Sequence, residues 1–237
     1  MSSSLPPYTC STLVNGLQLV LATMEGPVVA VRLMINAGTA DERPEEHGLA
    51  HLLEHMLFKG TTRRALAVGV AEIEAVGGDL NAWTSHDQTC LHATVDPSGW
   101  SIVLDVLADM LTAPTLDAEE LRKEIDVVSE EIRAADDDPD SLLADRVQAT
   151  LWPDHPYGHR ILGTLASVRS HTAERLRAFL RREYGPNRAP LVVAGPIDPD
   201  AVRDAADRAF ATWAPVPPRA PHPALPDRKS TRLNSSH

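Results

Sequence analysis

Cysteine is scarce in this sequence: only Cys10 and Cys90 occur, and they form no C-x-x-C pair. Disulfide-stabilised secreted domains and cysteine-based zinc sites need closely spaced pairs or larger sets of this residue. The sequence therefore gives no indication of a disulfide framework, and we expect both residues to be ordinary reduced thiols.

Long hydrophobic runs are also missing. No stretch reaches the ~18 apolar residues that a membrane-spanning helix needs, and the N-terminal residues lack the basic start and apolar core of a secretory signal. We therefore expect no membrane partner and a cytoplasmic location. Lysine occurs only at positions 59, 123 and 229, and arginine supplies the other basic residues. We interpret this bias as that of a GC-rich bacterial genome.

Positive charge is in deficit, because 22 Lys and Arg face 33 Asp and Glu, for a formal net charge of -11 at pH 7. Such a balance argues against nucleic acid or an anionic membrane as a partner, since both carry negative charge. It would suit a basic peptide. The hydrophobic fraction of 43% over 237 residues is that of a globular protein with a substantial core.

The pattern of apolar residues predicts an α+β fold. Alternating or β-branched runs predict strands over residues 8–13, 18–23, 28–36, 79–84, 88–95 and 190–194. Helical spacing predicts a helix around residue 51 and further helices over residues 65–76, 98–111, 116–136, 139–151, 172–183 and 198–213. We expect a mostly antiparallel sheet covered by helices, with residues 152–163 as a loop.

The most informative stretch is H-x-x-E-H, formed by His51, Glu54 and His55. At about 3.6 residues per turn, the two histidines lie on the same face of a helix, so both rings can reach one metal ion. Zinc binds imidazole nitrogens, and a catalytic zinc site takes three protein ligands and leaves a position for water. Glu54 borders the same face and is predicted to be the general base that takes the proton of that water.

A third ligand is expected from the acidic helix predicted over residues 116–136. Glu124 and Glu131 lie two helical turns apart on one face of it, whereas Glu130 points elsewhere. We predict Glu131 as the third zinc ligand. Glu124 is predicted to orient a ligand imidazole through its second ring nitrogen.

Three alternatives remain open for these groups. His47 lies four residues before His51 and could form a rival metal pair with it, although Glu54 would then have no role. The acidic helix could simply present a solvated face. His155, His159 and His171 could gather near one loop, but without a carboxylate at ligand spacing we expect surface or loop-packing roles for them.

Taken together, these motifs resemble those of the pitrilysin/insulinase family of zinc metallopeptidases, which includes the mitochondrial processing peptidases and bacterial relatives. The resemblance extends from about residue 8 to residue 213. It is carried by residues 48–61 (GLAHLLEHMLFKGT), 77–85 (GGDLNAWTS), 127–133 (VVSEEIR) with 137–139 (DDP), and 184–187 (YGPN) before 191–195 (LVVAG).

The resemblance implies a zinc metalloendopeptidase acting on peptides or proteins, with Asn81 and Ala82 on an edge strand that an extended substrate joins through its backbone. Members usually carry two such halves, so a C-terminal half or a partner subunit is expected to complete the site. The alternatives are a non-catalytic partner subunit, or an inactive peptide-binding fragment. A structural zinc site is a third reading, which the shortage of cysteine disfavours.

The composition changes after Trp213. Residues 1–213 are predicted to form the zinc-peptidase domain, and the proline-rich residues 214–226 the start of an extended, unpacked linker. Residues 227–237 (DRKSTRLNSSH) resemble the in-frame translation of a common sequencing adapter, so we predict that they are not native. Sequencing of the source locus tests this hypothesis, which fails if genomic DNA encodes the same residues.

Overall fold

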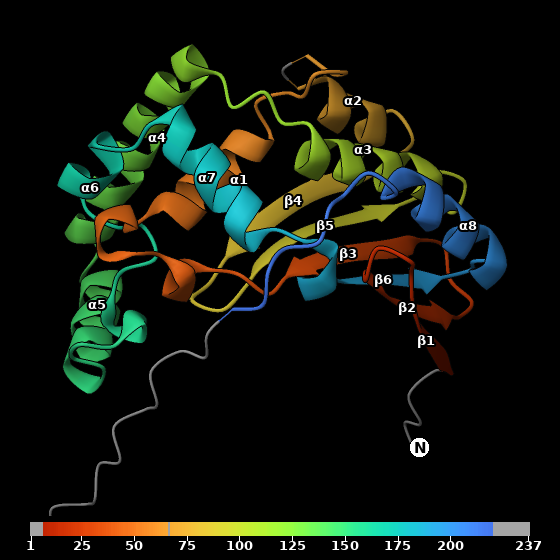
Figure 1. Ribbon diagram of the computed structural model, residues 1–237, viewed down its shortest axis with the longest axis horizontal. Coiled ribbons are helices and arrows are strands. Elements are labelled where there is room, and N and C mark those ends of the chain that lie inside the picture. The colour runs from red at the N-terminus through yellow and green to blue at the C-terminus, as the bar shows by residue number, and fades with distance from the viewer. Residues whose placement is uncertain (1–6, 66, 220–237) are drawn as a thin grey trace, which may run out of the picture.

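The computed structural model describes residues 7–65 and 67–219. A single six-stranded sheet and a layer of helices make up this part of the chain (Figure 1). The strands are β1 (Tyr8–Thr12), β2 (Gln18–Thr23), β3 (Val29–Ile35), β4 (Asp79–Thr84), β5 (Thr89–Val95) and β6 (Pro190–Gly195). Their order in the sheet is β1-β2-β6-β3-β5-β4, which makes β4 an edge strand.

The sheet is mostly antiparallel, as the sequence predicts. All neighbouring strands run antiparallel except β2 and β6, which are parallel and pair from Gln18 with Pro190 to Thr23 with Gly195. The β1–β2 hairpin turns at Asn15 and Gly16, where Gly16 has a φ of 93°. The side chain of Asn15 accepts a hydrogen bond from the backbone N–H of Leu17 (3.1 Å) and fixes this turn.

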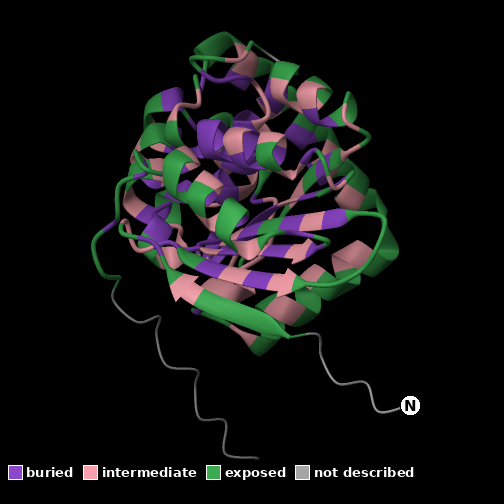
Figure 2. Cartoon of the chain, turned by 90° about the vertical axis from the view of Figure 1, so that its right-hand side faces the viewer, coloured by how far each residue is buried: buried purple, intermediate pink, exposed green. Residues whose placement is uncertain are grey.

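The central strands alternate buried residues with more exposed ones, so one face of the sheet is covered. Figure 2 shows the buried residues concentrated where the helices meet the sheet. The helices are α1 (Leu49–Leu57), α2 (Val68–Glu74), α3 (Trp100–Thr112), α4 (Ala118–Asp137), α5 (Pro139–Leu151), α6 (Leu165–Arg169), α7 (Ala173–Glu183) and α8 (Pro199–Ala209). Within residues 7–65 and 67–219 there are also four short 3-10 turns: η1 (Thr39–Asp41), η2 (Pro44–Glu46), η3 (Pro156–Gly158) and η4 (Pro186–Arg188).

Some predicted helix boundaries are wrong. The helix predicted over residues 65–76 begins only at Val68, because Ala67 adopts a left-handed conformation with a φ of 64°. The helix predicted over residues 198–213 ends at Ala209. The short helix α6 was not predicted, since five residues are too few to show a helical period.

The N-terminus of α1 depends on a glycine and on a glutamate from the preceding loop. Gly48 has a φ of 85°, and a Cβ there would lie 2.7 Å from the backbone oxygen of Leu162. The two carboxylate oxygens of Glu42 accept hydrogen bonds from the backbone N–H groups of Gly48 (3.0 Å) and Ala50 (2.7 Å). The side chain of Glu42 thus caps the helix from outside it and satisfies N–H groups that have no partner within the helix. Burial raises the pKa of Glu42 to about 8, although the hydrogen bonds from the Ala50 and Gly48 N–H groups oppose this effect.

The apolar residues of α1 fix the orientation of the helix in the core. Leu49, Ala50, Leu52, Leu53 and Met56 are fully buried. Because these residues turn inward, the polar residues of the motif are left on the side that faces α4 and β4.

We predicted that the stretch after Trp213 is unpacked. This prediction is wrong for the residues up to 219, which pack against the domain. The indole N–H of Trp213 donates to the carbonyl of Tyr184 (3.1 Å). The side chain of Asn187 donates to the carbonyl of Val216 (2.8 Å) and accepts from its N–H (2.9 Å), and Val216 is buried. The rest of the predicted linker and the adapter-like residues 227–237 lie outside the described residues.

No helix in residues 7–65 or 67–219 combines the length and the apolar character needed to cross a membrane.

Truncation of a buried leucine in α1 should destabilise the fold strongly. Leu53 is fully buried, so Leu53→Ala is expected to lower the free energy of unfolding by about 2–5 kcal/mol. Leu143 on α5 is 61% exposed, and Leu143→Ala is expected to change it by less than about 0.5 kcal/mol. Urea denaturation followed by circular dichroism measures both. Equal losses would contradict the packing of α1.

Candidate metal centre

Three of the predicted site residues come together in space. His51 and His55 on α1 face Glu131 on α4, and one ligand atom from each lies within 4.8 Å of the others. The Nε2 atoms of His51 and His55 are 3.8 Å and 3.7 Å from Oε2 of Glu131. In the described part of the chain, this is the one set of three such residues whose geometry could hold a metal ion.

The distances between the two imidazoles and the carboxylate of Glu131 fit three ligands of one metal ion better than direct hydrogen bonds between these groups. Distances of 3.7–3.8 Å are too long for hydrogen bonds. Ligands at about 2.0–2.1 Å from a tetrahedral zinc ion lie about 3.4 Å apart, close to what is observed. Burial, and secondarily the charge of His55, lower the pKa of His51 to about 4, so its ring is neutral at pH 7 and keeps a lone pair for a metal. Two imidazoles and a carboxylate are a donor set that zinc accepts.

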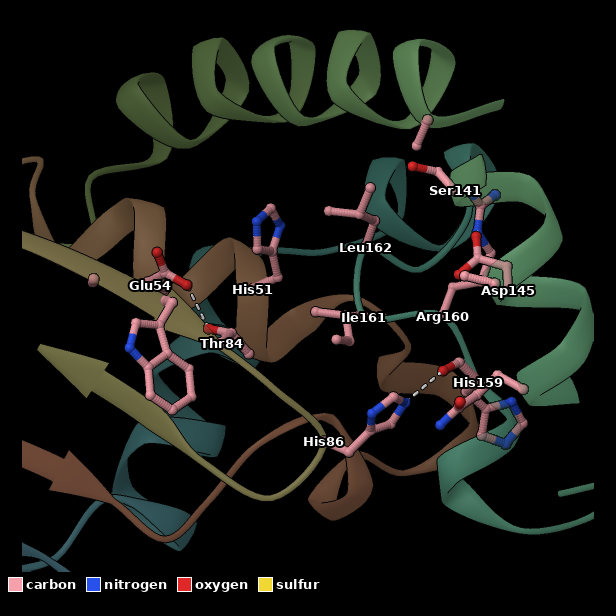
Figure 3. A pocket seen from close by; sticks show the side chains of 15 residues that line it. His51, Glu54, Thr84, His86, Ser141, Asp145, His159, Arg160, Ile161 and Leu162 are labelled. Atoms are coloured by element: carbon pink, nitrogen blue, oxygen red, sulfur yellow. Dashed lines mark hydrogen bonds and ion pairs between the residues drawn. The ribbon is translucent and has the colours of Figure 1, made fainter. Parts of the chain in front are cut away.

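Glu54 lies beside the three ligand candidates without belonging to their set. It is only 8% exposed, and its Oε2 accepts a hydrogen bond of 2.5 Å from the hydroxyl of Thr84 on β4. Burial raises the pKa of Glu54, while the hydrogen bond from Thr84 and the charge of His55 oppose this effect. Glu54 and His51 both line a cavity (Figure 3). The predicted base therefore lies next to the candidate metal ligands, at the wall of a space that could admit a substrate.

Glu124 lies behind His55, where the sequence predicted an orienting carboxylate. Its Oε1 is 3.7 Å from Nδ1 of His55, while Nε2 of the same ring faces Glu131. The other oxygen of Glu124 forms an ion pair with Lys59, which follows the end of α1. Sequence reasoning missed Lys59. Its spacing of four residues from His55 is no signal for this contact, because α1 ends at Leu57 and Lys59 lies beyond the helix.

Asn81 and Ala82 lie on β4, at the edge of the sheet, as the resemblance implied. The side-chain oxygen of Asn81 accepts a hydrogen bond from the backbone N–H of Ala82 (2.8 Å). Ala82, Trp83 and Thr84 line the same cavity as Glu54 and His51. The edge strand therefore borders the space next to the candidate metal ligands. Within the described residues, no further strand pairs with the outer side of β4.

The cavity has a volume of about 580 Å³. Strand β4 and the motif helix α1 form one side of it, and helix α5 with the loop before α6 forms the opposite side (Figure 3). Its lining is mixed, with apolar residues such as Trp83, Ile161 and Leu162 beside the charged Asp145 and Arg160. A space of this size fits several residues of an extended peptide.

His47, His155, His159 and His171 take no part in this centre. The ring of His47 packs against that of His159, with ring centroids 4.0 Å apart, and not against His51. The carbonyl of His47 accepts a hydrogen bond from Nε2 of His171 (3.1 Å). His155 is buried, and its Nδ1 accepts from the backbone N–H of Tyr157. These are packing roles, and the rival pair of His47 and His51 is not formed.

The sequence matches a known family over most of this region. Residues 19–165 match the family described as Insulinase (Peptidase family M16). The chain belongs to the M16 family. Residues 170–236 match a further M16 description, Peptidase M16 inactive domain. The resemblance inferred from the motifs is thereby confirmed.

Similar M16 proteins are found in bacteria and plants. An uncharacterized zinc protease of Bacillus subtilis is 37% identical over 200 residues, which cover 83% of this chain and 48% of that protein. A probable mitochondrial-processing peptidase subunit beta of Arabidopsis thaliana is 35% identical over 208 residues, 87% of this chain and 39% of that protein. The crystal structure of a protease from Helicobacter pylori has a TM-score of 0.87 at 27% identity, and the match covers 93% of this chain and 54% of that one. The α+β fold is thereby confirmed. The chain spans about half the length of the curated relatives that it matches.

Loss of Lys59, the ion-pair partner of Glu124, should destabilise the fold even when no metal is bound. Lys59→Met removes the cation that pairs with a carboxylate only 5% exposed, so we expect a loss of about 1–3 kcal/mol in the free energy of unfolding. Lys59→Arg should restore part of it. Lys123→Met, which removes an exposed lysine paired with Glu120, is the control and should leave stability unchanged. Urea denaturation distinguishes these outcomes, and identical effects of the two methionine variants would refute the pairing.

Proposed function

We propose that this chain is the zinc-binding part of a metalloendopeptidase, an enzyme that hydrolyses peptide bonds within proteins or peptides. The observation that carries the proposal is the convergence of His51, His55 and Glu131, with Glu54 beside them at a cavity wall. Membership of the M16 family and the zinc proteases among its relatives support it.

In this proposal His51, His55 and Glu131 hold the metal ion. When bound, zinc supplies a Lewis acid that activates water and polarises a carbonyl group. Glu54 takes a proton from the attacking water and later delivers it to the leaving amine. The hydroxyl of Thr84 donates to one carboxylate oxygen of Glu54 and fixes its orientation, which leaves the other oxygen free to accept the proton.

Glu124 and Lys59 act through His55. The carboxylate of Glu124 lies 3.7 Å from the ring nitrogen of His55 that points away from Glu131. In this proposal its negative charge attracts the N–H of that nitrogen and so orients the imidazole. Lys59 holds this carboxylate in place and compensates its charge. A metal ligand whose ring is already oriented loses less conformational freedom on binding, which favours the bound state.

The substrate in this proposal is an extended peptide that binds along β4. An edge strand can pair with another strand through backbone groups, and such pairing tolerates many side chains. Asn81 and Ala82 would provide the pairing positions, and the adjacent cavity would receive side chains of the substrate. A second M16 half or a partner subunit would cover the cavity and exclude water.

We propose a bacterial cytoplasmic location for the protein.

A non-catalytic partner subunit, or an inactive peptide-binding fragment, is the alternative function. Either would keep the cavity and the edge strand, but neither needs a base beside the metal ligands. The buried carboxylate of Glu54 next to His51 therefore favours the enzyme. A purely structural zinc site is disfavoured because Cys10 and Cys90 are both absent from the candidate metal group.

Glu54→Gln should separate catalysis from metal binding. The amide cannot accept a proton but keeps the size of the side chain, so we expect peptide cleavage to fall by about 10²–10⁴-fold. Zinc stoichiometry, measured by metal analysis after dialysis, should stay the same. Glu130→Gln, which changes an exposed carboxylate paired with Arg133, is the control and should keep full activity. Cleavage that survives in Glu54→Gln would show that another group is the base.

The two glutamates of α4 should differ in their effect on zinc affinity. Glu131→Gln removes a ligand, whereas Glu124→Gln removes a group that only orients one, for which a loss of about tenfold is expected. The loss in Glu131→Gln should be at least about tenfold larger again, and Glu130→Gln should lose nothing. Competition with a chromophoric chelator measures these affinities. Equal losses in Glu124→Gln and Glu131→Gln would overturn the assignment.

A further inference from the structure

Helix α5 has an unusual orientation for a helix that forms a cavity wall. Its polar face turns inward, where Ser141, Asp145 and Gln148 line the cavity. Its opposite face presents Leu143 and Val147 to solvent. None of the thirteen residues of α5 is buried. The helix therefore lacks the apolar contact with the core that holds most helices of a globular protein in place.

Arg160 supplies the contacts that apolar packing does not. Its Nη1 donates to Oδ1 of Asp136 in the last turn of α4 (2.8 Å), and its Nε is 2.5 Å from Oδ2 of Asp145 on α5. The guanidinium group thus bridges the two helices through one carboxylate on each. Only 24% of the Arg160 side chain is exposed, so solvent screens these ion pairs less than those on an open surface.

The loop that carries Arg160 is attached at its other end to the edge-strand hairpin. Nε2 of His86, in the turn between β4 and β5, donates to the carbonyl of His159 (3.0 Å; Figure 3). The hydroxyl of Tyr157 donates to the carboxylate of Asp87 in the same turn (2.6 Å). The loop therefore spans the cavity from the β4–β5 turn to α5, and both of its attachments are polar.

We propose that Arg160 is a positioning residue that fixes α5 against the loop and so sets the width of the cavity between α5 and β4. This proposal rests on the proposed function, because it assigns the cavity to the peptide substrate. Arg160 does not reach the candidate metal ligands: its partners are Asp136 and Asp145. Loss of the bridge should therefore weaken substrate binding and leave both zinc binding and the hydrolytic step unchanged.

Hydrogen exchange tests the bridge in the full 237-residue chain without a substrate. In Arg160→Gln, exchange of the backbone amides of α5 is expected to accelerate about fivefold or more, as loss of a partly buried ion pair would allow. Exchange in α1 and in the central strands should not change. Arg160→Lys should restore part of the protection. Arg203→Gln, which removes an exposed ion pair with Asp200 on α8, is the matched control. Unchanged exchange of α5 in Arg160→Gln would overturn the proposal.

Binding of substrate gives the second measurement. Fluorescein-labelled casein, an unfolded protein, is titrated with Glu54→Gln alone and with Glu54→Gln combined with Arg160→Gln. The double variant is expected to bind about fivefold more weakly, with unchanged zinc stoichiometry. In the active chain, Arg160→Gln should raise KM for casein and keep kcat. A fall in kcat or in zinc content at constant KM would overturn the proposal.

The two measurements separate this proposal from the proposed function. If the unaltered chain binds zinc but never cleaves casein, even when it is supplied with a second M16 half, the enzymatic function fails, whereas exchange of α5 still decides whether Arg160 holds the helix. If α5 loosens in Arg160→Gln but casein binding to the Glu54→Gln chain stays the same, the bridge is structural only and the positioning role is wrong.

Discussion

The contact between α1 and α4 is the constraint on which the site depends. The apolar residues of α1 are almost completely buried, and this packing turns His51 and His55 toward α4. At that crossing, Glu131 comes within 3.7–3.8 Å of both rings. At this distance the two imidazoles and the carboxylate do not hydrogen bond to one another. The packing of the core thus holds these three groups together. The packing of α1 against the core therefore fixes the relative positions of the three candidate ligands.

Two buried acids next to this centre, Glu124 and Glu54, each have a polar partner from a different part of the chain. Glu124 is paired with Lys59, and Glu54 accepts a hydrogen bond from Thr84. An uncompensated buried carboxylate would cost several kcal/mol or lose its charge. The partners thus keep the two acids in defined positions, one behind a candidate ligand and the other beside the cavity. The edge strand β4 supplies Thr84, the partner of Glu54, and also borders the cavity.

The cavity combines a rigid wall with a weakly packed one. The wall near the candidate ligands is made from α1 and β4, which adjoin the core. The opposite wall is α5, which buries none of its residues and is held by Arg160. The proposed function requires precise geometry at the candidate metal centre, whereas the proposed binding of varied peptides would gain from a wall whose position depends on a few polar contacts. The distribution of packing in the structure matches this division.

The sequence by itself determined the local features: the order of strands and helices, the shared face of His51 and His55, and the candidacy of Glu131, because all of these follow from helical and strand periods. It also indicated the family through its motifs. Only the tertiary structure decided which groups meet. The pairing of Lys59 with Glu124, the support of Glu54 by Thr84, the bridge from Arg160 to α5 and the docking of Val216 against Asn187 all join segments distant in sequence. Such contacts depend on how helices cross and how strands are ordered, which the burial of the whole core sets and no local period encodes.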